Sequence, residues 1–526
     1  MYELSWAIRI KPEWQRKAKD PGIMRKWRKE AMDALNDLYE PDKLSKKKMI
    51  EYVLDELDGY AEIADNERGI ERGPYEAIWY SDRLFSPDVL KRLRDAVSSL
   101  ENVPDAEKDW HPGSDGKVLD LVHPSLYCII YGRTHAYLSG KPRISSNLRP
   151  VGFPTEPNAK PFMLSGTCCW MPSDFTVTED GSVKLVSSYL NNLHPVRHRP
   201  LYPIVEEIIG GFIPLFERVL GDINKEGDRQ PFGNSGRLKE ISCVWGTEGE
   251  PWPKDEPDSD EDKEEFLNEF FADVKKVLPE ADAYTGQLEA RFSPVSLRGK
   301  NIQCIVKFAN IHLTPETPNY YGGSWHIEGM VNEHIVASGI YYYDEENIEQ
   351  SNLSFRVPTG EPEYHDQGDF RCVQILYGIA LESTRCNQDL GRVVIQEGRA
   401  LAWPNLFQHC VGPFNLADSC KPGHRKILAI FLVDPTIDPI VSATDIPPQQ
   451  AEWAADALDK AHADPTSNLA KVPQELSDMV KEHLPSTLMT LEEAKEYRLQ
   501  LMKERTVFEK DHRLTAYNQT FNMCEH

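Results

Sequence analysis

The spacing of hydrophobic and polar positions changes twice along the chain. Through residues 12–65 apolar side chains recur three or four positions apart, which is the spacing of one helical face. The same spacing returns from about Pro203 to Leu220, and again in two stretches after residue 435. Ser86 and Pro87 mark another helix start, because serine caps an N-terminus and proline suits the first turn. The pattern therefore predicts helices towards both ends of the sequence.

From about Gln287, short runs rich in β-branched and aromatic residues replace the helical spacing. Clusters of Gly, Pro, Asn and Asp separate these runs, and no helical pattern lies between them. Eight such runs are typical of a double-stranded β-helix, the jelly-roll barrel that closes around a small-molecule site. The runs are IQCIVKFANIHL, GSWHIEG, HIVASGIYYYD, LSFRV, CVQILYGI, GRVVIQEGRALAWP, FQHCVGPF and KILAIFLVDP.

The sequence thus predicts an α+β fold in three parts. A mainly helical region covers residues 1–285 and includes a dense acidic run at 254–266, which predicts an exposed loop. A double-stranded β-helix domain, expected to be the catalytic one, covers residues 286–440. Helices cover residues 441–526, and we expect them to pack on the outside of the barrel or on the N-terminal helices.

The chain of 526 residues carries a net charge of -25. Such an acidic surface repels phosphate backbones, which disfavours nucleic acid as a partner. No apolar run reaches the roughly 20 residues that span a bilayer, and the N-terminus lacks the features of a secretory signal. The 10 cysteines are scattered without paired CxxC motifs, which suits a reducing compartment. We therefore expect a cytoplasmic protein of undetermined oligomeric state.

Chemistry-bearing side chains concentrate in the stretch GGSWHIEGMVNEHIVASGIYYY, residues 322–343. His326 and Glu328 stand two positions apart, so on a strand both side chains point to the same face. His409, in the later run WPNLFQHCVGPF, is the candidate third ligand. Two imidazoles and a carboxylate on one face form a non-haem iron(II) site with open coordination positions. Glu333 and His334 remain alternative ligands within the same stretch.

A basic residue on a later strand extends this pattern. Arg425 lies in GHRKILAIFLVDP, where its planar fork of N–H donors suits the carboxylate of a co-substrate. Arg399 is a competitor for that role, but it lies nearer a turn. Each feature also has an ordinary explanation, since His409 could be a core histidine and Arg425 could pair with Asp434. The order of the features on successive β-runs favours the metal site.

The order His-x-Glu, distant His, then Arg resembles the iron(II)/2-oxoglutarate-dependent oxygenase superfamily over about residues 290–440. Glu328 departs from the usual His-x-Asp motif of that superfamily. The phrases WHIEG, PNLFQH and GHRKILAIFLVDP, with their helical flanks, also look like a large fungal domain family of unknown function. Fungal amino-acid oxygenases that make aziridine carboxylates are similar to that family.

The resemblance implies an iron(II)/2-oxoglutarate-dependent dioxygenase that oxidises a small molecule, by hydroxylation or by a cyclisation such as aziridine formation. It implies Fe(II), 2-oxoglutarate and dioxygen as cofactors, ascorbate as an activator, and an amino acid or a secondary metabolite as the substrate. The matching positions assign His326, Glu328 and His409 to the metal, and Arg425 to the distal carboxylate of 2-oxoglutarate.

Two further groups of residues are candidates for binding. Asn310 and His312 share one face of the preceding strand, and are candidates to hydrogen-bond 2-oxoglutarate or the substrate. The resemblance places Ile340 and Tyr342 on the wall of the substrate pocket. Alternation along the strand adds Ser338 to their face, and we expect that face to look into the barrel.

Other functions stay open at this stage. One is a cupin-like metal oxygenase that does not use 2-oxoglutarate, and another is a non-catalytic barrel that binds a ligand. A chromatin-type demethylase is less favoured, because no reader module or nuclear-localisation cluster is evident. The sequence does not indicate which substrate is used, or whether the outcome is hydroxylation, desaturation or ring closure.

Overall fold

The computed structural model describes residues 1–38, 43–154, 156, 159–224, 280–362 and 385–512. It also describes the single positions 237, 259, 266, 373, 374, 377, 517, 519 and 521. The predicted acidic loop at 254–266 therefore lies almost entirely outside the described residues. Most of the run CVQILYGI also lies outside them, and its described positions 373, 374 and 377 are helical, in contrast to the predicted β-run.

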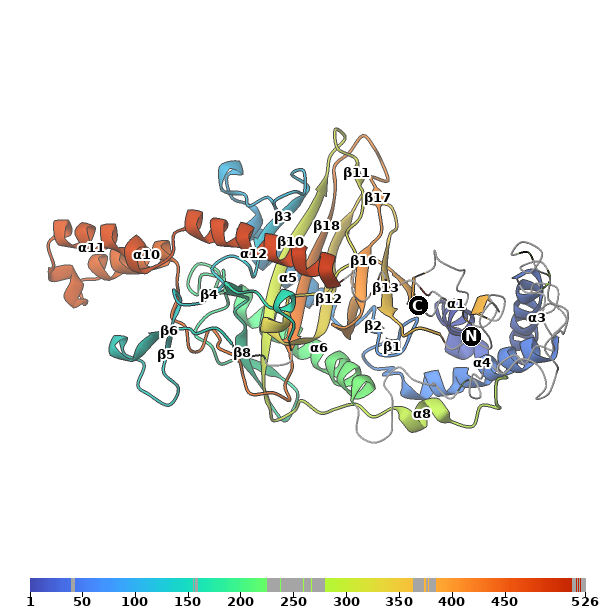
Figure 1. The fold of residues 1–526 in the computed structure, drawn as a ribbon. Helices are drawn as coiled ribbons and strands as arrows, with labels where there is room; N and C mark the ends of the chain where they lie inside the picture. The colour runs from blue at the N-terminus through green and yellow to red at the C-terminus, as the bar shows by residue number, and fades with distance from the viewer. Residues whose placement is uncertain are drawn as a thin grey trace.

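Helices cover both ends of the described chain, as the apolar spacing predicts (Figure 1). Ser86 caps α5, since its hydroxyl accepts a hydrogen bond from the Val89 N–H at 3.4 Å, and Pro87 begins the helix. Helix α6 is apolar along most of its length because it lies in the core. The helices are α1 (Tyr2–Arg9), α2 (Trp14–Ala18), α3 (Pro21–Leu38), α4 (Lys43–Ile63), α5 (Pro87–Glu101), α6 (Leu201–Ile223), α8 (Gln287–Arg291), α10 (Ala451–Ala463), α11 (Gln474–Thr487) and α12 (Leu491–His512).

A nine-stranded antiparallel sheet forms the centre of the molecule, with the order β1-β2-β15-β12-β18-β10-β8-β9 and with β3 also paired to β10. Its strands are β1 (Ile70–Arg72), β2 (Trp79–Ser81), β3 (Val118–Val122), β8 (Ser173–Val177), β9 (Val183–Leu185), β10 (Asn301–Leu313), β12 (Ile335–Glu346), β15 (Ala400–Pro404) and β18 (Gly423–Val433).

Smaller antiparallel sheets accompany the central one. The largest of them has the order β14-β13-β16 and carries one of the predicted metal ligands. Its strands are β13 (Asn352–Pro358), β14 (Asn387–Val394) and β16 (Gln408–Val411). The paired short strands are β4 (Ile129–Ile130) with β7 (Cys168–Cys169), β5 (His135–Tyr137) with β6 (Leu148–Pro150), and β11 (Asn319–Tyr320) with β17 (Phe414–Asn415).

Alternation along β12 sends side chains to the two faces of the central sheet. On one face Tyr341 belongs to the same core as Phe212 of α6. Gly339 permits this close approach of α6, since a Cβ atom there would lie 2.8 Å from the Phe212 ring. On the other face Ile340 packs in a core with Phe355 of β13. The central sheet is therefore enclosed between α6 and the three-stranded sheet.

The division of the chain differs from the predicted three parts. Strands β1, β2, β3, β8 and β9 all come from residues 1–285, which were expected to be mainly helical. They join the same sheet as β10, β12, β15 and β18. The long strands otherwise present unpaired edges, and these short strands cover them. The mixed α/β fold with its large antiparallel sheet thus spans both predicted regions.

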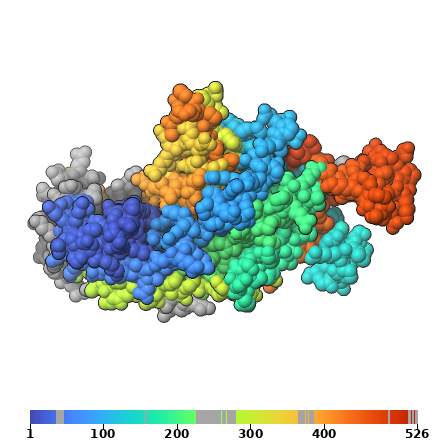
Figure 2. Space-filling model, turned by 180° about the vertical axis from the view of Figure 1, so that it is seen from behind, coloured from blue at the N-terminus to red at the C-terminus, as the bar shows by residue number. Residues whose placement is uncertain are grey.

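The helices after β18 take two different positions. Helices α10 and α11 extend away from the sheets, and form the red lobe at one end of Figures 1 and 2. Helix α12 instead returns across the strands in Figure 1, and its side chains Met502, Arg505 and Phe508 line a cavity. The part of the chain that the structure describes includes no helix with the length and apolarity to cross a bilayer.

Candidate metal centre

The structure brings the side chains of His326, Glu328 and His409 together. Figure 1 shows the strands β12 and β16 that flank this group. His326 and Glu328 lie in a loop between β11 and β12, so the strand predicted over GSWHIEG does not form, and His409 lies on β16. The backbones of His326 and His409 exchange two hydrogen bonds, with N···O distances of 3.2 and 3.0 Å. This isolated bridge holds the loop against β16, so that residues 83 positions apart in sequence (409 − 326) share one site.

The potential ligand atoms converge on one point. Oε1 of Glu328 lies 3.6 Å from Nε2 of His326 and 3.5 Å from Nε2 of His409. The two imidazole centroids are 4.3 Å apart. Ligand atoms about 2.1 Å from a shared metal ion, and at roughly right angles to each other, lie about 3 Å apart. The observed separations are slightly wider, so a small closure would produce a three-ligand facial site.

The two imidazoles are oriented with Nε2 towards Glu328. Nδ1 of His326 lies 2.8 Å from the Ser324 carbonyl oxygen, to which its N–H donates. That hydrogen bond leaves the Nε2 lone pair directed into the site, as a metal ligand requires. His409 is buried, and its ring meets the Trp403 ring edge-on at 4.9 Å.

The favoured protonation states of Glu328 and His409 also suit a cation at this site. Burial opposes the charged form of Glu328, but contact with the two imidazoles outweighs it and holds its pKa well below the ordinary range. Burial and the neighbouring His326 lower the pKa of His409 to about 4. For His326, burial lowers the pKa, but contact with Glu328 outweighs it and raises the pKa. Anionic Glu328 and neutral His409 are the forms that bind a divalent metal.

Asn405 fixes the backbone of Glu328 from both sides. Its Oδ1 accepts a hydrogen bond from the Glu328 N–H at 2.9 Å, and its Nδ2 donates to the Glu328 carbonyl at 2.7 Å. Nδ2 also donates to the Ile335 carbonyl at 3.3 Å. Asn405 was not among the residues predicted from the sequence. The one indication of its role was its position in the phrase PNLFQH, four residues before the candidate ligand His409.

Gly322 shapes the start of the ligand loop. Its φ of +91° lies in the left-handed region that favours glycine. A Cβ atom at this position would lie 2.8 Å from the Val411 carbonyl oxygen on β16. The loop can therefore approach the ligand-bearing strand only with glycine here.

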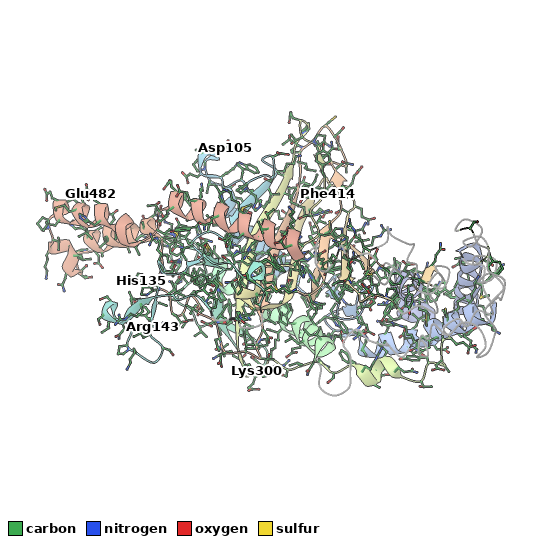
Figure 3. All side chains as sticks on the ribbon, viewed as in Figure 1. Asp105, His135, Arg143, Lys300, Phe414 and Glu482 are labelled. Atoms are coloured by element: carbon green, nitrogen blue, oxygen red, sulfur yellow. The ribbon has the colours of Figure 1, made fainter. Side chains whose placement is uncertain are left out.

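Arg425 is buried on β18, at the end of the sheets where β11 and β17 pair. Its Nε donates to Glu345 at 2.8 Å and its Nη1 donates to Ser351 at 2.7 Å. Its guanidinium lies 4.2 Å from the ring centre of Phe414, which Figure 3 labels at the tip of the strands. Among the described residues Nη2 has no hydrogen-bond partner, and neither does the buried hydroxyl of Tyr342. These two polar atoms are candidates to receive an anionic ligand.

The competing residues from the sequence have other partners. Arg399 pairs with Asp82, through two N–H···O contacts of 2.6 and 2.7 Å. His334 lies 3.0 Å from Glu156. The buried Glu333 carboxylate accepts hydrogen bonds from the backbone of Trp170 and Met330, and from Arg505. None of these contacts involves the His326–Glu328–His409 group.

Asn310 and His312 do not reach the site, in contrast to the expectation that they bind 2-oxoglutarate or substrate. They do share a face of β10, but the cavity lies on the opposite face, which carries Ala309 and Ile311. Asn310 instead hydrogen-bonds Glu101 at 2.7 Å, and its Oδ1 accepts from the Tyr343 hydroxyl. Alternation predicted correctly that the two side chains group together, but it does not say which face is internal.

The metal centre opens into a cavity of about 470 Å³. Ile340 lines it, as predicted, while Ser338 and Tyr342 share its strand face but are not on the cavity surface. The opposite parts of the wall come from β3, β10 and α12. The lining residues from these elements and their flanks include His111, Val118, His123, Ser125, Lys307, Ala309, Ile311, Met502, Arg505, Thr506, Phe508 and Glu509. These residues could not be predicted from the sequence, because they are remote from the ligand motif.

A second group of potential ligands consists of His111 and His123, which line this wall, and the buried Asp120 beside them. Nδ1 of His111 lies 2.8 Å from Oδ2 of Asp120, and Nδ1 of His123 accepts a hydrogen bond from the Ser125 N–H at 3.1 Å. Burial lowers the pKa of His123 well below its ordinary value, so this imidazole is neutral. Nδ1 is occupied as an acceptor, so the neutral ring carries its proton on Nε2 and offers no free lone pair to a metal.

The fold and the first of these groups define a mixed α/β protein with a candidate His–Glu–His metal centre at a cavity. A family described as a protein of unknown function (DUF4246) matches residues 47–457, and the chain belongs to this family. A search of the curated proteins finds no match.

The solved structures similar to this chain are distant. The Fe(II)/(alpha)ketoglutarate-dependent dioxygenase TqaL is 11% identical, with a TM-score of 0.23, over 68% of this chain and 94% of that one. IDO from Bacillus thuringiensis is 10% identical, with a TM-score of 0.17, over 28% and 51%. A bsmA homolog from Methylobium petroleophilum is 11% identical, with a TM-score of 0.16, over 27% and 46%. The chain spans about half the length of the last two, and TM-scores this low carry no argument about fold or function.

Proposed function

We propose that this protein is a non-haem iron(II) oxygenase that uses 2-oxoglutarate and dioxygen to oxidise a small molecule. The observation that carries the proposal is the convergence of His326, Glu328 and His409, with Nε2 of both imidazoles directed towards the Glu328 carboxylate. One carboxylate and two imidazoles suit iron(II), and three ligands on one face leave positions open for reactants. The two antiparallel sheets around the site support a double-stranded β-helix as its framework.

The residues around the centre have separate roles in this proposal. Bound iron would supply the redox chemistry by which dioxygen is activated while 2-oxoglutarate is converted to succinate. Arg425 and Tyr342 would hold the distal carboxylate of 2-oxoglutarate, because each has a buried polar atom without a partner among the described residues. Glu345 and Phe414 keep the guanidinium in place through an ion pair and ring stacking.

The cavity wall would orient the substrate and exclude water. Ile340 borders the cavity beside the ligands, and its side chain would decide which substrate atom faces the metal. The proposed substrates are amino acids or secondary metabolites, and the proposed outcomes are hydroxylation or an oxidative cyclisation such as aziridine formation. Fixed apolar walls favour one orientation, on which the choice between these outcomes depends.

The test is substrate-dependent succinate formation by protein reconstituted anaerobically with Fe(II), then supplied with 2-oxoglutarate, ascorbate, air and a panel of amino acids. We expect His326→Ala and His409→Ala to abolish succinate formation. His334→Asn is the matched control, because His334 lies nearby in sequence but pairs with Glu156, and asparagine tolerates its φ of 48°. Full activity in both alanine variants would refute the proposed metal centre.

One observation favours a second function, a cupin-like metal oxygenase without 2-oxoglutarate. Arg425 already has an ion pair with Glu345, so its charge is compensated without a co-substrate. Arg425→Gln separates the two functions. If the protein is a 2-oxoglutarate-dependent oxygenase, the substitution raises the 2-oxoglutarate concentration needed for half-maximal activity by about 10-fold or more. If it is a cupin-like oxygenase, oxidation proceeds without 2-oxoglutarate and the substitution has no such effect. Failure to bind iron on anaerobic reconstitution would instead favour a non-catalytic barrel.

A further inference from the structure

We propose that the substrate of the oxygenase carries a carboxylate, and that Lys307 and His123 anchor it in the cavity wall formed by β10 and the end of β3. This inference rests on the proposed function, since it concerns the same cavity. It names the chemical class of the substrate and the residues that select it.

Lys307 is an unusual residue for its position. The inward-facing row of β10 reads Ile305, Lys307, Ala309 and Ile311, and the last three line the cavity. A lysine in such an apolar row loses hydration, so it normally has an anionic partner. Within the described part of the chain, no ion pair or hydrogen bond of the Lys307 ammonium is found at contact distance. The cavity therefore contains a cation available to a ligand.

The sheet register places Lys307 across the cavity floor from the residues beside the metal. Ile340 of β12 pairs with Ala429 of β18, and Ala429 pairs with Lys307 of β10. All three side chains line the cavity. Neighbouring strands are about 4.8 Å apart, so the backbones of Ile340 and Lys307 are separated by roughly 10 Å. A small molecule can thus reach from the ammonium of Lys307 to the region beside Ile340.

His123 supplies a second donor at the same end. Its Nδ1 accepts from the Ser125 N–H, so its neutral ring presents an Nε2–H group, and both residues line the cavity. An ammonium and a neutral N–H donor together suit a carboxylate, which accepts hydrogen bonds at both oxygens.

Asp120 is the main charge that opposes an anion here. Its Oδ2 receives the hydrogen bond of His111 and lies 3.7 Å from the Arg498 guanidinium. Arg498 also pairs with Asp109 through two N–H···O contacts. These contacts compensate the charge of Asp120 through its Oδ2 atom, while its Oδ1 atom has no hydrogen-bond partner among the described residues. Lys307 and Arg498 also make a divalent cation at the His111–Asp120–His123 group unfavourable, in agreement with the tautomer of His123.

A purely structural role for Lys307 is the alternative, in which its charge only balances Asp120. The two roles differ in what they predict for a neutral ligand. An anchor discriminates a carboxylate from its methyl ester, whereas a structural counter-ion affects the fold and treats both ligands alike.

The experiment uses a panel of small carboxylic acids, amino acids included, each paired with its methyl ester. Succinate formation is measured for wild type, Lys307→Met and Lys307→Arg, together with direct binding of each pair to the manganese-loaded protein by calorimetry. Methionine keeps the length and apolar stem of lysine without its charge, and arginine keeps the charge. Arg425→Gln is the control for the co-substrate carboxylate.

We expect the best acid to have a KM about 10- to 100-fold lower than its ester in wild type, which is the effect of one charge-assisted hydrogen bond. In Lys307→Met the acid should lose this advantage while the KM for 2-oxoglutarate stays unchanged, and Lys307→Arg should restore much of it. Arg425→Gln should show the reverse, with a raised KM for 2-oxoglutarate and an intact preference for the acid.

Three results would overturn the inference. One is equal loss of acid and ester binding in Lys307→Met, which indicates a structural role. Another is a raised KM for 2-oxoglutarate in that variant, which makes Lys307 the co-substrate anchor. The third is wild-type protein that does not prefer acids. If no compound supports succinate formation, the proposed function fails, and calorimetric preference for acids that depends on Lys307 still supports the anchor.

Discussion

Replacing Asn405 with alanine is expected to weaken metal binding without removing a ligand. The side chain makes four hydrogen bonds, to the Glu328 N–H, the Glu328 carbonyl, the Ile335 carbonyl and the Ser338 hydroxyl. Without them, the backbone that carries Glu328 is free to shift, and the carboxylate no longer stays within reach of both imidazoles.

The magnitude follows from these contacts. Four hydrogen bonds at about 1 kcal/mol each predict a loss of about 4 kcal/mol in the free energy of unfolding. Groups that orient a metal ligand typically contribute 10- to 100-fold in affinity, so we expect the Kd for Fe(II) to rise by about that factor. Asn405→Asp should fall between wild type and Asn405→Ala, because it keeps the acceptor for the Glu328 N–H but loses the two Nδ2 donors.

The assay combines anaerobic Fe(II) titration with urea unfolding of the metal-free protein. Gln449→Ala is a matched control, since Gln449 and Asn405 are each 8% exposed. Gln449 makes three side-chain hydrogen bonds, one fewer than Asn405, to Tyr127, Cys128 and Thr134. We expect Gln449→Ala to lose similar stability and to keep its iron affinity. Wild-type iron affinity in Asn405→Ala, together with the expected loss of stability, would refute the positioning role.

Three further outcomes are expected. Gly322→Ala should lower both Tm and iron affinity. The φ of +91° is strained for alanine, and the added methyl group would meet the carbonyl oxygen of Val411 on β16. Unchanged Tm and iron affinity would contradict this prediction. Burial raises the pKa of Asp344, but hydrogen bonds from His424 and Lys426 outweigh it and lower the pKa to about 2. This carboxylate therefore stabilises the fold by about 2 kcal/mol above pH 4, and the contribution disappears as pH falls towards 2. Asp344→Asn should flatten the stability curve, measured by urea unfolding, in that window. Phe508→Ala should cost about 3 kcal/mol of stability and raise the KM for substrate, with iron affinity unchanged by titration.

The grouping of His326, Glu328 and His409 at the candidate metal centre could be predicted because these residues lie in short motifs. His326 and Glu328 are adjacent alternate positions, and His409 follows in a run with its own turn and β signals. The helix at Ser86 could be predicted for the same reason, since its cap and first turn are local features. In each of these elements, the residues that determine the local structure lie within a few positions of one another in the sequence.

Features that depend on strand register could not be predicted. Arg425 has Glu345 as its partner because β18 and β12 place these residues opposite each other, whereas the sequence suggested Asp434, nine positions away (434 − 425). The mistaken interpretation of Asn310 has a related cause. Alternation fixes which residues share a face, but the internal face is decided by α5 and the sheets that pack on β10.

The sequence also does not indicate which strands form the cavity wall. β3 and β10 are separated by almost 180 residues, yet they pair and place His123 beside Lys307. No periodicity within either strand indicates this partner. Lys307 does stand out locally, as the one charged residue in the run IQCIVKFANIHL. Its role could not be predicted, because the sequence does not show which face of this strand lines the cavity.

The contribution of α12 to the cavity has a consequence for biosynthesis. This helix follows every metal ligand in the chain, so a ribosome produces His326, Glu328 and His409 well before Phe508. If the proposed centre binds iron, the three ligands could assemble and take up an ion during that interval, while one cavity wall is still missing. The later addition of α12 would complete the wall, so metal loading and substrate selectivity would be acquired at different times by a nascent chain.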